Sequence, residues 1–233
     1  MDNNTQTPAE ISSLAAPLMS HLLAYGFLNK VFYLSPEEPF IQALADDKLF
    51  DEWPLSADNE QTQIGLQLLQ TFLDSWHSTQ LADLQRDYAR LFIGPDRLLA
   101  PPWESVYLSR ENLLFEEQTL AVRNFYGRFN LQAPNLNSEP DDHIGLELAF
   151  MAHLCTLGLT AVAQNDVAAV ETSLQALRDF LAQHLLRWAP QFCQKVIEQA
   201  QTDYFRGVGY LTLGCLQTAA ARLEMTELLG TAA

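Results

Sequence analysis

Length, composition and charge limit what this chain can be. Its 233 residues, 48% of them hydrophobic, can bury a full core as one large domain or as two closely packed ones, so the protein is globular and not disordered. Thirteen Lys and Arg against twenty-nine Asp and Glu give a net charge of −16, which repels phosphate backbones and anionic lipid. We therefore expect no nucleic-acid partner, and we expect a cationic peptide to be favoured.

Targeting signals and cysteines narrow the setting further. The first ten residues, MDNNTQTPAE, lack the basic segment of a secretory signal, and no run of eighteen or more uncharged apolar residues occurs. We therefore expect a cytoplasmic protein without stable membrane insertion. Cys155, Cys193 and Cys215 are far apart in helical sequence, which fits neither a disulfide framework nor a thiolate zinc site and predicts buried thiols.

Apolar residues recur at helical spacing along most of the chain, with no convincing strand, repeat or low-complexity tract. The expected helices cover residues 9–34, 59–76, 80–93, 116–129, 138–159, 166–190, 191–201 and 204–229. The pattern predicts an all-α protein of about nine to ten helices, with residues 1–233 forming one domain. Within it we expect two closely packed halves, residues 9–129 and 138–229, joined by a polar hinge at 130–137.

The helix predicted at 138–159 is the one around which the others are expected to pack. Ser138 is its expected N-cap, and Pro140 would occupy the first turn, where a missing N–H costs little. More than one face of this helix is apolar, which is typical of a central helix covered on most sides. His143 and Glu147 then share a face at the rim of the interior, among Glu139, Asp141 and Asp142.

Residues 96–108, DRLLAPPWESVYL, are expected to form a rigid extended segment, because Ala100 and Pro101 each precede a proline. Strand spacing would place Trp103, Ser105 and Tyr107 on one side of it. Two interpretations stay open for this segment. In one, it is a loop whose tryptophan fills the core; in the other, it is a binding loop, since long loops with aromatic residues are often functional sites.

Three hypotheses compete for the acidic cluster. Asp142, His143 and Glu147 could hold a metal ion in a helical enzyme, although no second His and Glu pair completes a two-metal site. The acids could instead only cap a helix in a non-catalytic scaffold. The third hypothesis is ligand recognition. The absence of a Gly-rich phosphate loop or nucleophile motif gives no support to an enzyme, and we expect no cofactor.

Several separated blocks resemble the TorD/DmsD family of redox-enzyme maturation chaperones, most closely its DmsD branch. The blocks are YARLFIGP at 88–95, APPWESV at 100–106 with Arg110-Glu111, EPDDHIG at 139–145, HLLRW at 184–188 and YFR at 204–206. They extend over most of the chain and occur in the family's order. One departure is Tyr107, where the branch often has a second tryptophan.

The resemblance implies an all-helical chaperone that binds the twin-arginine signal peptide of a molybdenum-cofactor enzyme, such as the catalytic subunit of dimethyl sulfoxide reductase. It would delay export until the cofactor is in place, with the Tat translocase as a further partner. A formate dehydrogenase or another reductase stays open as the client, as do the oligomeric state and any binding of a guanine nucleotide. The residues implied for peptide binding are Leu91, Phe92, Trp103, Arg110, Glu139, Pro140, Asp142 and His143, followed by Tyr88 and Tyr33.

A twin-arginine peptide offers two guanidinium groups followed by an apolar run. We expect Glu139 and Asp142 to receive the arginines by charge-assisted, bidentate hydrogen bonds. Leu91, Phe92 and Trp103 would bury leucines, each worth about 1.5–3 kcal/mol. The apolar part should dominate the affinity, since exposed ion pairs contribute about 0–1 kcal/mol each, while the negative surface favours encounter.

Overall fold

The structure is a computed structural model that describes residues 8–55, 58–95, 97–108, 117–134 and 140–223. The helices are α1 (Pro8–Ser13), α2 (Ala15–Tyr33), α3 (Glu38–Asp46), α4 (Glu60–Asp74), α5 (Leu81–Tyr88), α6 (Glu104–Leu108), α7 (Glu117–Gly127), α8 (Ile144–Gln164), α9 (Val167–Phe180), α10 (Leu186–Gln199) and α11 (Asp203–Arg222). Nine of these have eight residues or more, and the described ranges contain no strand, so the predicted all-α fold is confirmed. One isolated antiparallel bridge pairs Trp103 with His143.

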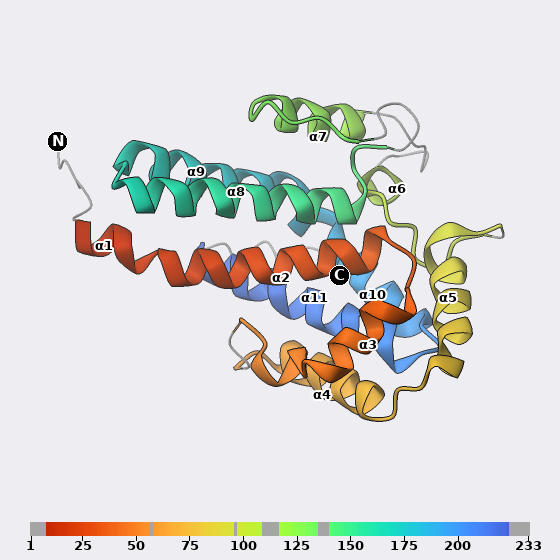
Figure 1. Ribbon diagram of the computed structural model, residues 1–233. Coiled ribbons are helices and arrows are strands. Elements are labelled where there is room, and N and C mark those ends of the chain that lie inside the picture. The colour runs from red at the N-terminus through yellow and green to blue at the C-terminus, as the bar shows by residue number, and fades with distance from the viewer. Residues whose placement is uncertain (1–7, 56–57, 96, 109–116, 135–139, 224–233) are drawn as a thin grey trace.

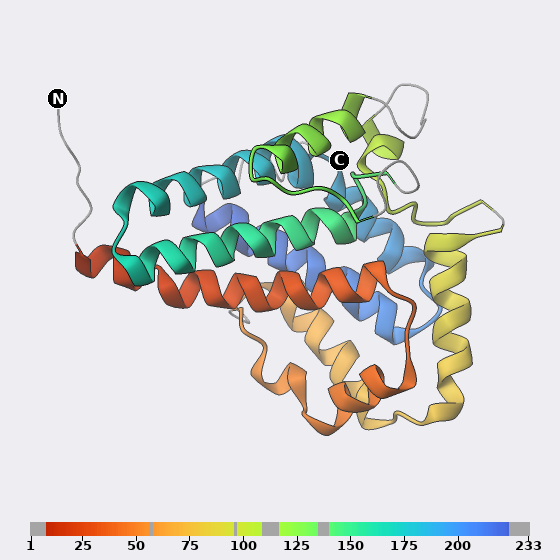
Figure 2. The same cartoon turned by 45° about the horizontal axis from the view of Figure 1, so that its top comes forward.

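The longest helices, α2, α8 and α11, form the centre of the molecule. Figures 1 and 2 show α8 lying along α2, α9 returning beside α8, and α4 packed against α11. The helices α2 and α8 are antiparallel, because Tyr33 near the end of α2 lies at Gly145, whereas Leu18 near its start lies at Gly158. This arrangement brings the end of α2 to the beginning of α8, where the candidate site is located.

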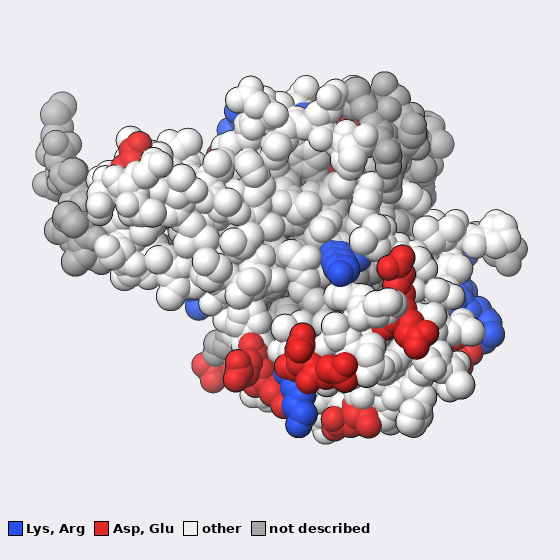
Figure 3. Space-filling view, in the orientation of Figure 1, with Lys and Arg blue, Asp and Glu red and all other residues white. Residues whose placement is uncertain are grey.

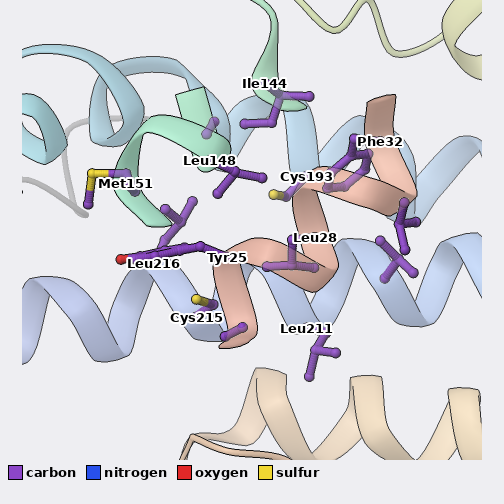
Figure 4. Close-up of a cluster of buried hydrophobic side chains, with 14 of the residues drawn as sticks. Tyr25, Leu28, Phe32, Ile144, Leu148, Met151, Cys193, Leu211, Cys215 and Leu216 are labelled. Carbon is purple, nitrogen blue, oxygen red and sulfur yellow. The ribbon is translucent and has the colours of Figure 1, made fainter. Parts of the chain in front are cut away.

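The core is built where four helices meet. Figure 4 shows Tyr25, Leu28 and Phe32 of α2 among residues of α8, α10 and α11. Tyr25, Leu28 and Phe32 are at most 1% exposed, which is how a helix apolar on several faces is accommodated. The three cysteines are buried free thiols, as predicted, and burial raises the pKa of the Cys155 thiol to about 12.

The crossing of α4 over α11 depends on two glycines. A Cβ atom on Gly65 would lie 2.8 Å from the backbone nitrogen of Leu211, and one on Gly207 would lie 2.8 Å from the Leu69 side chain. Both distances are shorter than packed atoms allow, so the two backbones approach closely only because these side chains are absent.

The predicted start of the central helix is wrong. The central helix begins at Ile144 and not at 138, so Pro140 precedes it, and Ser138 lies outside the described residues. His143 is its N-cap, with Nδ1 accepting from the Gly145 N–H at 3.0 Å. Residues 140–143 stay out of the helix because the Asp141 and Asp142 side chains bind partners elsewhere in the fold.

Proline also acts differently from the prediction at two places. The segment after Pro102 is not extended throughout, because Glu104–Leu108 forms the short helix α6. Pro190 does not end a helix but lies inside α10, which follows a π-helical turn at Leu181–Leu185. Trp188 and Phe192 are fully buried on either side of Pro190, and this packing offsets the backbone hydrogen bond that proline removes.

Two stretches, Ile11–Tyr33 and Ile144–Gln164, are long and apolar enough to cross a membrane, with mean hydropathies of 1.4 and 1.6. This is weak evidence for a membrane span, since core helices of globular proteins meet the same criteria. In the second stretch, 56% of the apolar window is buried inside the fold.

Candidate functional site

Two loops distant in sequence are joined at the beginning of α8. The Ile144 N–H donates to the Pro102 carbonyl at 2.8 Å, and the Glu104 N–H donates to the Asp142 carbonyl at 3.0 Å. We call residues 102–104 and 142–144 the loop pair. Its two middle residues, Trp103 and His143, form the antiparallel bridge. Two of the sequence blocks that carry the family resemblance, 100–106 and 139–145, are therefore joined in the fold.

The Asp142 side chain connects the loop pair to α6 and α7 by hydrogen bonds. Its Oδ2 accepts from the Ser105 N–H at 2.7 Å, and its Oδ1 accepts from the Thr119 hydroxyl at 2.8 Å. The Asp142 side chain is fully buried. Both carboxylate oxygens already have protein donors, so in this conformation Asp142 acts on the site by fixing α6 and α7 to the start of α8.

Aromatic side chains gather above the loop pair. The His143 ring lies 5.9 Å from Trp103 and 5.4 Å from Tyr33, measured between centroids, and both contacts are edge-to-face. Trp103 and Tyr33 are half-buried, whereas His143 is only 5% exposed. Gly145 permits this approach, since a Cβ atom there would lie 2.9 Å from the Tyr33 Cβ. The Asn29 side chain donates to the Gly145 carbonyl at 2.7 Å and fastens α2 to the same place.

Burial lowers the pKa of His143 to about 3. The imidazole is therefore neutral near pH 7. Because its Nδ1 accepts a hydrogen bond from Gly145, the proton is on Nε2, which is a donor. The site thus combines aromatic surface with a neutral donor and places no positive charge at His143.

Two further acids lie beneath the loop pair. The Glu104 carboxylate is 2.9 Å from the His184 Nδ1, and the Trp188 Nε1–H donates to the Glu147 Oε2 at 3.2 Å. Burial, together with the negative charges of Glu104 and Asp142, raises the pKa of Glu147 well above its ordinary value. Its other oxygen, Oε1, is buried with no hydrogen-bond partner in the described part of the chain, so no donor there stabilises a negative charge.

Asp141 also binds α7, one helical turn beyond the Thr119 contact of Asp142. Its Oδ2 accepts from two nitrogens of Arg123, Nη2 at 2.6 Å and Nε at 3.0 Å. The Tyr126 hydroxyl donates to the Asp141 carbonyl at 3.1 Å. Asp141 is fully buried, whereas the Arg123 side chain is 29% exposed, so this ion pair is partly accessible to water from the arginine side.

The structure divides the residues implied for peptide binding into groups. Trp103, His143 and Tyr33 lie together in the aromatic group. Leu91 and Phe92 are in the core at 0% and 1% exposure and offer no surface in this conformation. Five positions remain. Asp142 is fully buried with both carboxylate oxygens bonded to Ser105 and Thr119, and Tyr88 is buried with its hydroxyl donating to the Phe32 carbonyl. Pro140 is buried, and Arg110 and Glu139 lie outside the described residues.

The metal-site hypothesis finds no geometric support. Across the described ranges, no group of three His, Cys, Asp or Glu side chains is arranged to hold a metal ion. The Asp142 oxygens, the His143 Nδ1 and the Glu147 Oε2 each already accept a hydrogen bond from the protein.

The sequence pattern missed several residues that hold the site together. Thr119 and Arg123 come from α7, and His184 and Trp188 come from the π-helical turn and α10. His184 did carry a signal, because a histidine inside a long apolar stripe needs a polar partner in the core. Thr119 and Arg123 lie in an ordinary amphipathic helix, which gives no such signal.

Comparisons with known proteins find similarity to one family. The family described as nitrate reductase delta subunit matches residues 56–194. The Tat proofreading chaperone DmsD of Salmonella typhi is 32% identical over 188 residues, covering 79% of this chain and 81% of that protein. The chaperone protein TorD of Vibrio cholerae is 30% identical over 211 residues, covering 86% of this chain and 85% of that protein.

A crystal structure of a protein from Archaeoglobus fulgidus, proposed to be a redox enzyme maturation protein, is 19% identical. It covers 82% of this chain and 91% of that chain, with a TM-score of 0.48. The DmsD and TorD relatives are named as chaperones and not as enzymes. The match to residues 56–194 and the identities of 32% to DmsD and 30% to TorD show that the chain belongs to the TorD/DmsD family of redox-enzyme maturation chaperones and is not an enzyme.

Proposed function

We propose that this protein is a cytoplasmic chaperone for one redox system. It binds the twin-arginine leader of a molybdenum-cofactor oxidoreductase and holds back export until the cofactor is inserted. The support is its membership of a family whose relatives are named Tat proofreading chaperone DmsD and chaperone protein TorD. The proposed client is the catalytic subunit of a dimethyl sulfoxide reductase-like enzyme. The Tat translocase is a further proposed partner, to which the leader passes on release.

The loop pair is the single structural observation that carries this proposal. It holds Trp103 and His143 beside Tyr33, so an apolar peptide can bury side chains against two half-exposed aromatic rings. Leu34, which follows Tyr33, is 52% exposed and adds apolar surface. Burying one leucine side chain is worth about 1.5–3 kcal/mol, so a few such contacts suffice for specific binding.

We propose different roles for Glu139 and Asp142, the two acids expected from the sequence to bind the arginines of the leader. Asp142 positions the loop pair, because its oxygens already accept from Ser105 and Thr119. Glu139 is the proposed acceptor for a leader arginine, with Arg110 as a second contact. Leu91, Phe92, Tyr88 and Pro140 would support the surface from beneath. This assignment separates loss of structure from loss of peptide contact.

Fluorescence anisotropy of a labelled leader peptide tests the proposal. Trp103→Ala should weaken binding at least tenfold, since it removes one large aromatic contact worth about 1.5–3 kcal/mol. Trp53→Ala is the matched control, because Trp53 is also half-buried with an unpartnered indole N–H within the described chain. Equal affinities for these two variants would reject the loop pair as the binding surface.

A second comparison tests the arginines. A leader in which both arginines are replaced by lysines should bind several-fold more weakly, because lysine cannot make the planar, bidentate contact. Glu139→Gln should remove this discrimination, whereas Asp142→Asn should lower the stability of the protein together with its affinity. Leaders of a dimethyl sulfoxide reductase, a formate dehydrogenase and another reductase, compared in the same assay, identify the client.

A further inference from the structure

A cavity lies away from the loop pair. It has a volume of about 440 Å³, is open to solvent on one side, and is lined by α2, α8, α9 and the end of α11. Most of its wall is apolar, with Leu14 and Leu18 on one side and Met151, Leu174 and Leu177 on the other. This size and this kind of lining are typical of pockets for small molecules, which measure about 300–1,000 Å³.

His21 is one of the residues that line this cavity. The side chain is 8% exposed, and its Nδ1 lies 2.9 Å from the Pro17 carbonyl. A carbonyl only accepts, so Nδ1 carries the proton, and Nε2 is left as an acceptor. Nε2 is buried and has no hydrogen-bond partner within the part of the chain that the structure describes. Burial, with a smaller effect of the Arg222 charge, lowers the pKa of His21, so the ring is neutral near pH 7.

Tyr25, one turn further along α2, lines the cavity next to His21. The two ring centroids are 5.7 Å apart. Burial raises the pKa of Tyr25 well above 10, so its hydroxyl stays protonated. Figure 4 shows this side chain extending from α2 with the hydroxyl oxygen at its outer end. The wall therefore offers an acceptor at His21 and a hydroxyl at Tyr25 on one side of an apolar space.

Two arginines give the cavity its charge. Arg178 of α9 and Arg222 of α11 both line it, and both are exposed. No Asp or Glu is among its described lining residues. In a protein with thirteen basic and twenty-nine acidic residues, two arginines at one apolar cavity favour an anionic ligand.

We propose that this cavity binds a small amphipathic anion. Its apolar body would fill the space between α2 and α9, a hydroxyl would donate to His21 Nε2, and a carboxylate or sulfonate would pair with Arg178 and Arg222. The site is independent of the loop pair, because none of its lining residues belongs to residues 102–104 or 142–144. Leader binding can therefore be measured in parallel as an independent readout.

The probe for this test is 6-hydroxynaphthalene-2-sulfonate, which combines the apolar body, the hydroxyl and the anion. Naphthalene-2-sulfonate lacks the hydroxyl, and 2-naphthol lacks the anion. Titration of the full chain by calorimetry should show the complete probe binding about fivefold or more tightly than either half, since one net hydrogen bond or ion pair is worth that factor. Equal affinities for all three compounds would overturn the proposed polar contacts.

Variants assign the contacts to residues. His21→Phe keeps an aromatic side chain but removes the nitrogen acceptor. It should weaken binding of the hydroxylated probe about fivefold and leave binding of naphthalene-2-sulfonate unchanged. Arg178→Gln with Arg222→Gln should weaken both sulfonates and remove the salt dependence of their binding. The matched control is Arg86→Gln with Arg187→Gln, two exposed arginines that do not line the cavity.

A variant that fills the cavity tests whether the probe binds there. Leu174→Trp should occupy the cavity, abolish probe binding and leave leader binding unchanged. Undiminished probe binding in this variant would place the probe elsewhere and reject the site. A protein that binds no probe but forms a dimer in sedimentation, which Leu174→Trp disrupts, would show that a second copy of the chain occupies this face and would also overturn the proposal.

Discussion

Acidic side chains behave in opposite ways in two regions of this molecule. The inner acids, Glu104, Asp141, Asp142 and Glu147 around the beginning of α8, are at most 1% exposed. The outer acids gather on the face built by α3, α4 and the turn between them, where Figure 3 shows red atoms over the lower part of the molecule. The outer acids are Glu38, Asp46, Asp47, Asp51, Glu52, Asp58, Glu60 and Asp74, all exposed.

The difference shows that net charge and structural role are separate properties. The outer acids contribute the negative field that attracts a cationic peptide, and little is lost when one of them is neutralised. Each inner acid holds a protein donor from another helix, so its loss leaves a buried group without a partner. The following variants are ordered by the size of the effect expected from this contrast.

Asp142→Ala should have the largest effect. It leaves the Ser105 N–H and the Thr119 hydroxyl buried without an acceptor, which should lower the free energy of unfolding by about 3 kcal/mol. Urea denaturation measures this, and Asp142→Asn, which keeps one acceptor oxygen, should lose less. Asp47→Ala on the outer face is the control and should change stability by less than about 0.5 kcal/mol. A loss of similar size in both alanine variants would contradict the contrast.

Arg123→Met should come next and lower the free energy of unfolding by about 2 kcal/mol, because the fully buried Asp141 would lose its charged partner. The loss is smaller than for Asp142→Ala because Arg123 is partly exposed, so water can reach the position that its side chain leaves. Adding Asp141→Asn should restore most of this loss in a double-mutant cycle. Arg86→Met breaks the exposed pair with Asp83 and should cost about 0.5 kcal/mol or less. A cycle without coupling would show that Arg123 contributes only by packing.

Glu147→Gln should change the pH dependence of stability. The folded protein holds a proton on Glu147 that the unfolded chain releases above its ordinary pKa, so this group's contribution falls as pH rises from there through the raised folded pKa. Glutamine is neutral and can still accept from Trp188, so the variant should gain stability relative to the native protein between pH 5 and 8, by at most about 1.4 kcal/mol per pH unit. Urea denaturation across that range measures the difference. Glu171→Gln, at an exposed position of α9, is the control, and parallel curves for both variants would reject a protonated Glu147.

Neutralising the outer acids should have the smallest effect on stability. Replacing Asp46, Asp47, Asp51 and Glu52 by their amides should change the free energy of unfolding by less than about 1 kcal/mol in total. Stopped-flow fluorescence should instead show a several-fold slower association with a cationic leader at low salt, and little change in dissociation. An unchanged association rate would mean that this face does not steer the peptide.

Part of the candidate site could be predicted from the sequence. The blocks around Trp103 and His143 were both identified by their resemblance to the TorD/DmsD family, and the structure joins them by backbone hydrogen bonds. The direction of each acid could not be predicted, since Asp141 and Asp142 are neighbours in sequence yet bind different partners, Arg123 and Thr119. Nor could the pattern tell that Leu91 and Phe92 are fully inside, because a helix with several apolar faces does not reveal which one meets solvent.

By itself the sequence determined the helical class, the family, the apolar central helix and the buried thiols, because these depend on local periodicity and composition. Only the tertiary structure decided which acids are structural and where the cavity lies. The inner acids are paired with groups from 18 to 80 positions away, such as Arg123 for Asp141 and His184 for Glu104. A buried charge must find a partner in space, and the identity of that partner is set by how the helices pack and not by neighbouring residues.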